Sequence, residues 1–257
     1  MTPEAIAAIV GPAHVLTAEA AAGYARDWTG TRHWQPLAVA RPAGTAEVSA
    51  LVTAARAARV PVVPVSGNTG LSGGTLAEGA LMISTERMTA IREIRPAARI
   101  AIVEAGVVLA ALHDAAEDHG LAFPLTFGAR GSARIGGCLA TNAGGSNVLR
   151  YGNARDLCLG IEAVLPDGRV LDLMSELHKD NSGYSLRHLM IGSEGTLGIL
   201  TAAVLKLHPR PRARATGMVA AQTLDGALHL LNRLQEATGG AVEAFEYMPR
   251  SYVADWV

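Results

Sequence analysis

The chain has 257 residues, 49% of them hydrophobic and 4% aromatic, so it is long enough to bury the core of one or two domains. Its 22 basic and 23 acidic side chains form no block of like charge, which gives no electrostatic basis for binding nucleic acid or an anionic membrane. The two cysteines form no CxxC pair, the N-terminus lacks a signal-peptide pattern, and no apolar run is long enough for a membrane span. We therefore expect a cytoplasmic protein.

Helix and strand patterns alternate up to a proline-rich stretch at 208–211. A helix with Thr45 as its N-cap is predicted first, and a strand over 60–65 follows it. Further patterns predict strands over 81–83, 100–103, 121–123 and 199–207, a hairpin of 157–165 with 170–173, and helices between 108 and 119, over 138–142 and over 184–190. Pro209 and Pro211 cannot donate ladder hydrogen bonds, so they mark a predicted domain boundary.

The residues beyond this boundary predict one unit of a second domain. A strand over 217–221 is followed by a helix that places Leu228, Leu231 and Leu234 inward, and then by a strand over 241–247. A single strand–helix–strand unit cannot form an independent core. We therefore expect the sequence to stop inside its second domain.

The first of three glycine clusters extends from Ser66 to Gly74 and contains four glycines in nine residues. Such a loop lets backbone N–H groups approach a phosphate closely and adopt positive φ. Its GxxGxxG spacing differs from the Rossmann fingerprint, and the chain contains no GxxxxGK[ST] loop. Taken by itself, this loop is more often an ordinary tight turn than a ligand site.

The second cluster, from Gly128 to Gly145, places Gly136 and Gly137 at the start of a short predicted helix. Free N–H groups at a helix start favour an anion or an electron-rich ring edge, so this cluster favours a functional role. The third cluster, 191–199, holds Glu194 in a tight bend between glycines. Its carboxylate is either structural or meets a ligand hydroxyl, and by itself the structural interpretation is favoured.

The three clusters, in this order and spacing, resemble the FAD-binding domain of the vanillyl-alcohol oxidase type, also called the PCMH type. Within that family the sequence is most similar to the D-lactate, glycolate and D-2-hydroxyglutarate dehydrogenases. The resemblance extends over residues 28–211 and is carried by Gly67–Leu71, Ile135–Gly137, Thr141–Gly145, Arg150–Gly152, Lys179–Tyr184 and Gly192–Gly198.

The resemblance implies an α+β fold in which FAD lies between two α/β subdomains. We expect an N-terminal helical segment over 1–34, a PCMH-type FAD-binding domain over 35–211, and, over 212–257, the beginning of a truncated, ferredoxin-like substrate-binding (cap) domain. Most of the substrate-binding half is then missing from this chain.

The resemblance also implies the residues that bind FAD. The first loop holds the pyrophosphate through backbone N–H groups, the second cluster follows the flavin and phosphates, and Gly195, Gly198 and Ile199 border the adenosine. The predicted cofactor-binding residues are Ser66, Gly67, Asn68, Thr69, Gly70, Leu71, Gly73, Gly74, Pro124, Gly128, Gly131, Ser132, Ile135, Gly136, Cys138, Thr141, Asn142, Gly144, Tyr151, Gly152, Glu194, Gly195, Gly198 and Ile199.

Two residues depart from the family pattern. Ser66 stands where relatives commonly have a second glycine, which slightly limits the turn. Asn68 stands where members that link FAD covalently often carry histidine, so we predict non-covalent FAD. Cys138 has no basic neighbour that would lower its pKa, and we interpret it as a small apolar filler near the cofactor.

The activity implied by the family is oxidation of a D-2-hydroxyacid to a 2-oxoacid by hydride transfer to flavin N5. The reduced flavin then passes electrons to an unidentified acceptor, which is an electron-transfer flavoprotein, a quinone or a cytochrome. The chain offers no convincing catalytic base, so no catalytic residue is predicted. Its eight histidines show no ligand spacing, and we expect no metal site; the metal used by relatives of the 2-hydroxyglutarate type belongs to their second domain.

Two other functions stay open at this point. The chain is alternatively an oxidase of another alcohol on the same fold, or an FAD-binding fragment or subunit without activity of its own.

Overall fold

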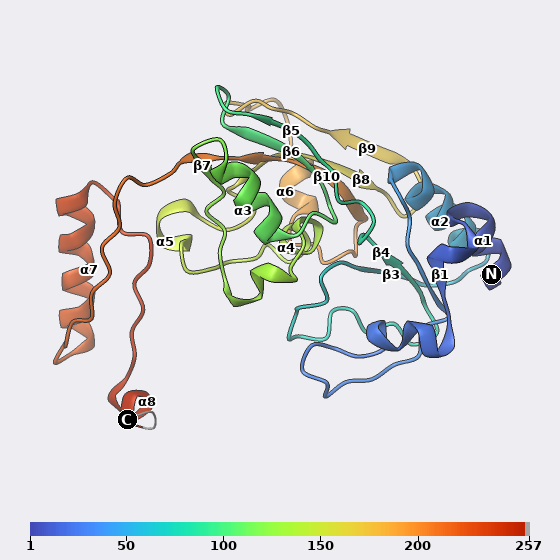
Figure 1. Cartoon of the computed structure of the whole chain (residues 1–257), viewed down its shortest axis with the longest axis horizontal. Coiled ribbons are helices and arrows are strands. Elements are labelled where there is room, and N and C mark those ends of the chain that lie inside the picture. The colour runs from blue at the N-terminus through green and yellow to red at the C-terminus, as the bar shows by residue number, and fades with distance from the viewer. Residues whose placement is uncertain (255–257) are drawn as a thin grey trace.

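The structure, a computed structural model that describes residues 1–254, contains two subdomains that lie against each other and a C-terminal arm that stands apart from them (Figure 1). The first subdomain is built on a four-stranded sheet in the order β1-β2-β4-β3. Its strands are β1 (Val15–Leu16), β2 (Ala38–Ala40), β3 (Val62–Val65) and β4 (Leu81–Ser84). Strands β2, β4 and β3 are parallel, and β2 and β4 consist entirely of buried residues, as strands covered on both faces do.

The helices of this subdomain are α1 (Pro3–Val10) and α2 (Thr45–Ala57), with 3₁₀ turns η1 (Pro12–His14) and η2 (Ala18–Tyr24). The N-terminal segment is not separate from the sheet, because β1 pairs with β2 and Ile6 and Val10 join the same core as α2. The domain boundary at residue 34 therefore stays a prediction.

The predicted role of Thr45 as the N-cap of α2 is wrong. The cap position belongs to Gly44, and the Thr45 hydroxyl donates to Glu162 Oε1 at 2.5 Å. The carboxylate of Glu47 accepts a hydrogen bond from the N–H of Ala43 at 2.8 Å. Thr45 does not cap the helix because its hydroxyl bonds to Glu162, which is distant in sequence. Near the helix start, the Glu47 carboxylate accepts from the N–H of Ala43 instead.

The second subdomain is a five-stranded antiparallel sheet in the order β5-β6-β10-β8-β9. Its strands are β5 (Ile91–Arg95), β6 (Ile100–Glu104), β8 (Cys158–Val164), β9 (Val170–Leu173) and β10 (Ile199–Lys206). The predicted hairpin of β8 with β9 is confirmed, and so is the long strand that became β10. A separate pair, β7 (Leu121–Ala122) and β11 (His208–Pro209), closes the end of this subdomain.

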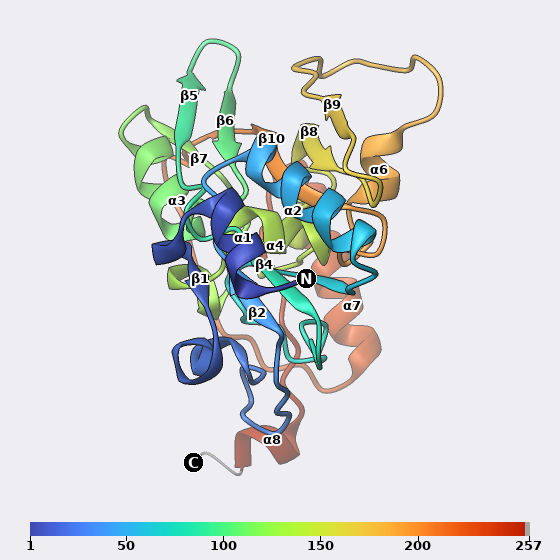
Figure 2. The same cartoon turned by 90° about the vertical axis from the view of Figure 1, so that its right-hand side faces the viewer.

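Helices of the second subdomain cover one face of its sheet (Figure 2). They are α3 (Leu109–Glu117), α4 (Ile135–Ala140), α5 (Val148–Tyr151) and α6 (Leu186–Met190), with the 3₁₀ turn η3 (Gly128–Gly131). The main hydrophobic core lies between these helices and the sheet. Val164 and Ile199 join the core of the first subdomain instead, so the two subdomains share a packed interface.

The C-terminal arm contains α7 (Leu224–Thr238) and α8 (Arg250–Ala254). The predicted helix is confirmed in α7, but the strands predicted over 217–221 and 241–247 are wrong, because neither segment has a neighbouring strand to pair with. The leucines of α7 do not point into a core either, since Leu228 is 52% exposed and Leu234 is 38% exposed. The assignment of 212–257 to a second domain stays a prediction, and its last three residues lie outside the described part.

Candidate cofactor-binding site

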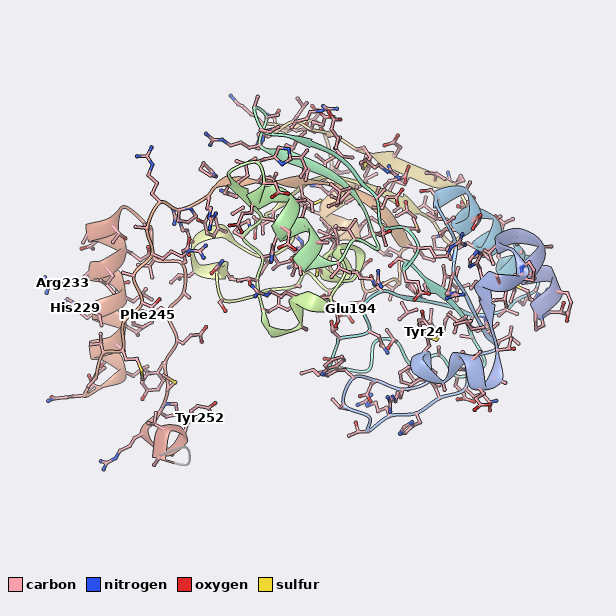
Figure 3. The ribbon with its side chains drawn as sticks, in the orientation of Figure 1. Tyr24, Glu194, His229, Arg233, Phe245 and Tyr252 are labelled. Carbon is pink, nitrogen blue, oxygen red and sulfur yellow. The ribbon has the colours of Figure 1, made fainter. Side chains whose placement is uncertain are left out.

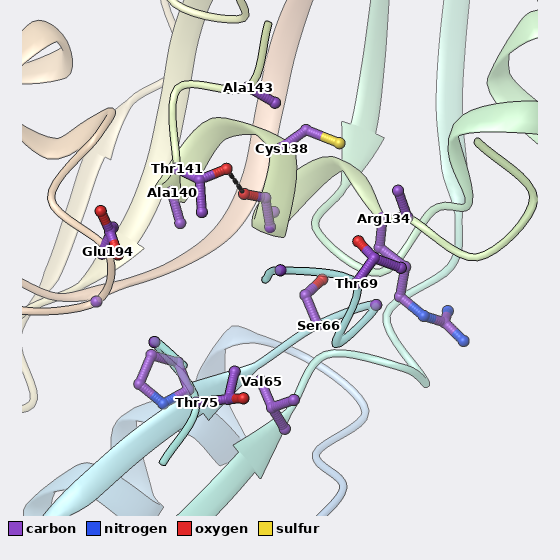
Figure 4. A pocket seen from close by; sticks show the side chains of 18 of the residues that line it. Val65, Ser66, Thr69, Thr75, Arg134, Cys138, Ala140, Thr141, Ala143 and Glu194 are labelled. Carbon is purple, nitrogen blue, oxygen red and sulfur yellow. Dashed lines mark hydrogen bonds between the residues drawn. The ribbon is translucent and has the colours of Figure 1, made fainter. Parts of the chain in front are cut away.

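A cavity of about 490 Å³ lies between the two subdomains (Figure 4). This volume is within the range of pockets that hold small molecules and cofactors, roughly 300–1,000 Å³. Its walls come from the loop after β3, from the residue after β4, from α4 with its flanking loops, and from the turn that enters β10. The three glycine clusters, far apart in sequence, thus meet around one space.

The first loop presents unused hydrogen-bond donors to this cavity. The backbone N–H groups of residues 67–72 donate to no acceptor among residues 1–254. Asn68 adopts a φ of 49°, and its amide group secures the loop by donating from Nδ2 to the carbonyl of Arg26 at 3.0 Å and by accepting from the Thr75 hydroxyl at 2.8 Å. The loop is therefore held from outside while its N–H groups stay free, which suits an anionic ligand.

Backbone segments lie close together at two glycines, one in the first cluster and one in the second. A Cβ atom on Gly67 would lie 2.4 Å from the carbonyl oxygen of Ser132, and one on Gly136 would lie 2.7 Å from the Cβ of Ala105. The N–H of Gly136 donates to the carbonyl of Ala105 at 2.7 Å. Gly67 thus allows the first loop to approach the segment before α4, and Gly136 allows α4 to approach the turn after β6, more closely than any side chain would permit.

The third cluster forms a turn that is fixed to α4. The N–H of Glu194 donates to the carbonyl of Ala140 at 2.9 Å, and the N–H of Gly192 donates to that of Leu139 at 3.0 Å. Glu194 has a φ of 52°, and its Oε2 lies 3.3 Å from the position that a Cβ on Gly74 would occupy. The carboxylate therefore faces the end of the first loop.

Two charged residues line the cavity among those that the structure describes, Arg134 and Glu194, and Figure 4 shows them on opposite sides of it. The Arg134 guanidinium donates to the carbonyl oxygens of Gly106 at 2.7 Å and Glu86 at 3.4 Å. It has no carboxylate partner there, so its positive charge is not neutralised by the protein.

The thiol of Cys138 also lines the cavity, and burial raises its pKa to about 12. It is therefore protonated at neutral pH and neither a nucleophile nor a base. The interpretation of Cys138 as a small apolar filler agrees with this environment.

Many of the residues predicted to bind the cofactor line this cavity. They are Ser66, Gly67, Asn68, Thr69, Gly70, Gly74, Gly136, Cys138, Thr141, Gly144, Glu194, Gly195, Gly198 and Ile199. The remaining predicted residues lie outside its lining, and for them a contact with the cofactor stays a prediction: Leu71, Gly73, Pro124, Gly128, Gly131, Ser132, Ile135, Asn142, Tyr151 and Gly152.

Two of the predicted residues outside the cavity lining have side chains that are hydrogen-bonded to neighbouring segments. The Tyr151 hydroxyl donates to Glu243 of the C-terminal arm at 3.1 Å. The side-chain oxygen of Asn142 accepts from the N–H of Arg155 at 3.0 Å. Both side chains are thus engaged in holding neighbouring segments.

Several lining residues were not predicted: Pro64, Val65, Ser72, Thr75, Thr85, Phe127, Ala133, Arg134, Gly137, Ala140, Ala143 and Leu200. Most of them lie inside a glycine cluster or directly beside one, next to a residue that was predicted. Thr85 is different, because it reaches the cavity only through the parallel pairing of β4 with β3, where its hydroxyl lies 2.9 Å from that of Ser66.

Residues 36–174 match the family model of an FAD binding domain. The chain belongs to this family. It is 44% identical to a D-2-hydroxyglutarate dehydrogenase of Xanthomonas citri pv. viticola over 227 residues, which are 87% of this chain and 47% of that protein. It is 38% identical to the mitochondrial D-2-hydroxyglutarate dehydrogenase of Bos taurus, over 86% of this chain and 41% of that protein. It is 43% identical to a D-lactate dehydrogenase of Archaeoglobus fulgidus, over 74% of this chain and 43% of that protein.

The chain spans less than half the length of these three relatives. Solved structures share its fold: alkyldihydroxyacetonephosphate synthase has a TM-score of 0.72 at 24% identity, over 83% of this chain and 45% of that one. A variant of Phl p 4, a glucose oxidase, has a TM-score of 0.69 at 21% identity, over 81% of this chain and 44% of that one. The predicted fold and the resemblance to the dehydrogenase branch are confirmed.

The residues present fit FAD. Consecutive free N–H groups match a pyrophosphate, and the close glycine contacts keep the loop that carries them against α4. The cavity extends on both sides of that loop, toward Glu194 and toward Arg134, as an elongated dinucleotide requires.

Over residues 1–254, three or more histidine, cysteine, aspartate or glutamate side chains nowhere gather closely enough to hold a metal ion. Every helix in the same range is too short or too polar to cross a membrane.

Proposed function

We propose that this chain is the FAD-binding portion of an oxidoreductase that converts a D-2-hydroxyacid to a 2-oxoacid, and that it binds FAD without a covalent link. The observation that carries the proposal is the row of free N–H groups at residues 67–72, in a loop that lines a cavity between the two subdomains. The substrate class rests on the names of the relatives, which are D-2-hydroxyglutarate and D-lactate dehydrogenases.

FAD, when bound, supplies the redox chemistry by accepting a hydride at its flavin ring. The chain's own residues bind and orient it: the first loop donates to the pyrophosphate, and Arg134 places positive charge at one side of the cavity. Over residues 1–254 the lining has no histidine, lysine or tyrosine, the Cys138 thiol is protonated, and the one lining carboxylate, Glu194, lies on the side of the cavity opposite to Arg134. The base and the group that holds the substrate carboxylate are therefore assigned to residues outside this cavity.

Non-covalent binding is supported by Asn68. An amide nitrogen is not nucleophilic, and both polar atoms of this side chain are already hydrogen-bonded to the protein. The side chain is an anchor of the loop, so it is not placed to attach a flavin.

The partners follow from the same proposal. The electron acceptor would be an electron-transfer flavoprotein, a quinone or a cytochrome, and we expect no nucleic-acid partner. Both cysteines are free and buried, which suits the reducing cytoplasm; one relative, by its name, is mitochondrial.

A second candidate is an FAD-binding fragment or subunit that has no activity of its own. The described lining offers no histidine, lysine or tyrosine and a single carboxylate, that of Glu194, which favours it. An oxidase of another alcohol is the weaker alternative, because the likeness to a glucose oxidase variant concerns the fold alone.

The first test is to purify the chain with FAD and record its visible spectrum, then to denature it and filter the sample. We expect a protein-bound flavin spectrum before denaturation and free flavin in the filtrate after it. Flavin retained with the denatured protein would contradict non-covalent binding. A protein that takes up no FAD would contradict the central proposal.

The second test adds D-2-hydroxyglutarate or D-lactate to the loaded protein without oxygen, with the L-isomers as controls. Bleaching of the flavin band by a D-isomer alone supports the dehydrogenase. An unchanged band in a protein that does bind FAD supports the inactive fragment or subunit.

A further inference from the structure

The edge of the second subdomain from which the C-terminal arm leaves concentrates positive charge (Figure 1). Strands β6 and β8 begin at this edge and β10 ends there, because both are antiparallel to β10, whose Lys206 pairs with Ile100 and whose Leu205 pairs with Cys158. Basic side chains from separate stretches of the chain meet at these strand ends. We call this set the basic edge; it consists of Arg99, Arg155, Arg187 and Lys206, with His178, His188 and His208 among them.

Hydrogen bonds to backbone carbonyl oxygens hold most of these cations in place. Lys206 Nζ donates to the carbonyl of Asp156 at 2.5 Å, and the Arg187 guanidinium donates to that of Leu159. Arg155 likewise donates to a carbonyl oxygen, at 2.6 Å. A carbonyl group carries no net charge, so these contacts fix the cations without neutralising them.

Carboxylates of the protein do not balance this charge. Within residues 1–254, the four cations of the basic edge form no ion pair with an acidic side chain. Burial and the surrounding cations lower the pKa of His188, on which Asp156 acts in the opposite direction, and they also lower the pKa of His208. Both imidazoles are therefore neutral at neutral pH, and the excess charge is that of the arginines and the lysine.

Exposed apolar side chains lie within the basic edge, on and beside α6, which runs next to β8 (Figure 2). Leu186 and Leu189, on either side of Arg187 in this helix, are 43% and 61% exposed, and Tyr184 just before it is 98% exposed. Tyrosine and arginine are enriched where proteins bind one another, and the centres of such interfaces are apolar. The composition of the basic edge is therefore that of a protein-binding surface.

A carboxylate from another segment already docks beside this edge. Glu243, in the part of the arm that holds Phe245 (Figure 3), pairs with Arg150 at 3.2 Å and accepts from the Tyr151 hydroxyl at 3.1 Å. The Tyr151 ring packs edge-on against His208, with 4.8 Å between the ring centroids. The molecule thus uses, at one end of the edge, the same chemistry that the rest of the edge offers: a cation beside an aromatic ring, facing a carboxylate.

An extended polyanion fits this surface less well than a protein does. Nucleic acids and anionic membranes present long arrays of negative charge and suit domains that are basic overall. This chain has a net charge of −1, so the surface outside the basic edge is negative in sum and opposes such an array. A protein partner contacts the edge alone.

We propose that the basic edge is a docking surface for a partner protein whose matching surface carries carboxylates interspersed with apolar side chains. The cations steer and orient the partner, and Tyr184 and Leu189 supply apolar area that leaves water on binding. The surface is separate from the cavity assigned to FAD, because its residues do not line that cavity.

The test measures the affinity of the full chain for a random copolymer of glutamate and tyrosine, by fluorescence anisotropy at low and at physiological salt. Poly-L-glutamate and polyphosphate are the comparison ligands. The variant R99Q/K206Q removes two charges of the basic edge, and L189S removes an exposed apolar side chain. R56Q/R59Q, on the exposed surface of the first subdomain, is the matched control, because Arg59 shares with Arg99 a φ of 54°.

We expect R99Q/K206Q to weaken the copolymer by about 2- to 30-fold, the range for two exposed charge contacts, and salt to weaken the wild type as well. L189S should weaken the copolymer and leave poly-L-glutamate unchanged. R56Q/R59Q should bind like the wild type. Circular dichroism checks the fold of each variant, and R99Q alone carries the test if the double variant does not fold, since the Arg99 side chain is exposed.

The proposal fails if the wild type does not bind the copolymer, or if R56Q/R59Q loses as much affinity as R99Q/K206Q. Polyphosphate bound as tightly as the copolymer would show a site for any polyanion and would also overturn it. An equal effect of L189S on the copolymer and on poly-L-glutamate would contradict the apolar part of the surface, and with it the match to a protein.

Discussion

At the scale of single residues, the site depends on positions where no side chain fits. Gly67 lies against the backbone of the second cluster, and a Cβ atom there would meet the Ser132 carbonyl at 2.4 Å and the Ala133 Cα at 2.9 Å. Both neighbours are backbone atoms, which cannot rotate away. Gly70 in the same loop has open space at that position.

The substitution G67A should therefore destabilise the protein by about 1–3 kcal/mol, the usual cost of overpacking, and should weaken FAD binding by displacing the loop. G70A serves as the control and should leave the unfolding temperature of the FAD-free protein unchanged. Thermal unfolding and FAD titration measure the two effects. Equal unfolding temperatures for both variants would contradict the close packing at Gly67.

The sequence showed which glycines form the clusters, but it did not show why each of these positions requires a glycine. Glycine content and spacing predicted the three clusters, because few other residues tolerate such turns. Only the structure shows that Gly67 is required by contact with Ser132, while the positive φ nearby belongs to Asn68. Arg134 escaped prediction because a single arginine within a glycine cluster gives no signal in one sequence.

At the scale of elements, one carboxylate joins the two subdomains. Glu162 on β8 accepts hydrogen bonds from the hydroxyls of Thr45, at the start of α2, at 2.5 Å, and of Thr201, on β10, at 2.8 Å. Its side chain is 18% exposed. These bonds tie the helix of the first subdomain to the central strands of the second.

The substitution E162A should lower the free energy of unfolding by about 1–3 kcal/mol, because it leaves two hydroxyls without their charged acceptor. E176A removes a more exposed carboxylate that pairs with Arg95, and should cost at most about 1 kcal/mol. Urea unfolding compares the two. A loss in E162A no larger than in E176A would show that Glu162 does not join the subdomains.

Periodic patterns predicted the β8–β9 hairpin, the long strand β10 and α7. They failed at three other segments. Residues 217–221 and 241–247 have the composition of strands but no strand beside them, and β5 was missed because its exposed arginines and glutamate hide the pattern. Whether these segments form strands is decided by pairing with another strand and not by local propensity.

At the scale of the whole molecule, the C-terminal arm is weakly attached. Glu243 joins it to the body through Arg150 and the Tyr151 hydroxyl, and it also pairs with Arg214 within the arm. Such partly exposed ion pairs contribute little stability. The arm also carries exposed apolar side chains: Met218, Val219, Leu224, Leu228, Leu234, Tyr247 and Met248.

A chain shortened to residues 1–211 should keep its FAD affinity and its unfolding temperature, because the cavity is lined only by residues between 64 and 200. It should also self-associate less, since the exposed leucines of α7 are removed. FAD titration and light scattering, with the full chain as control, test both expectations. Loss of FAD binding in the shortened chain would place part of the site in the arm.

The amino-acid sequence by itself determined the order of the main elements and the three glycine clusters, because turn chemistry and hydrophobic periodicity are local properties of a chain. The FAD-binding family followed from the resemblance of these clusters, in their order and spacing, to a known domain. The tertiary structure decided which of these residues meet. Glu194 and Gly74 lie far apart in sequence, yet packing of the β10 turn on α4 brings the carboxylate to the end of the first loop. Contacts of this kind depend on how two subdomains fit together, which no local pattern records.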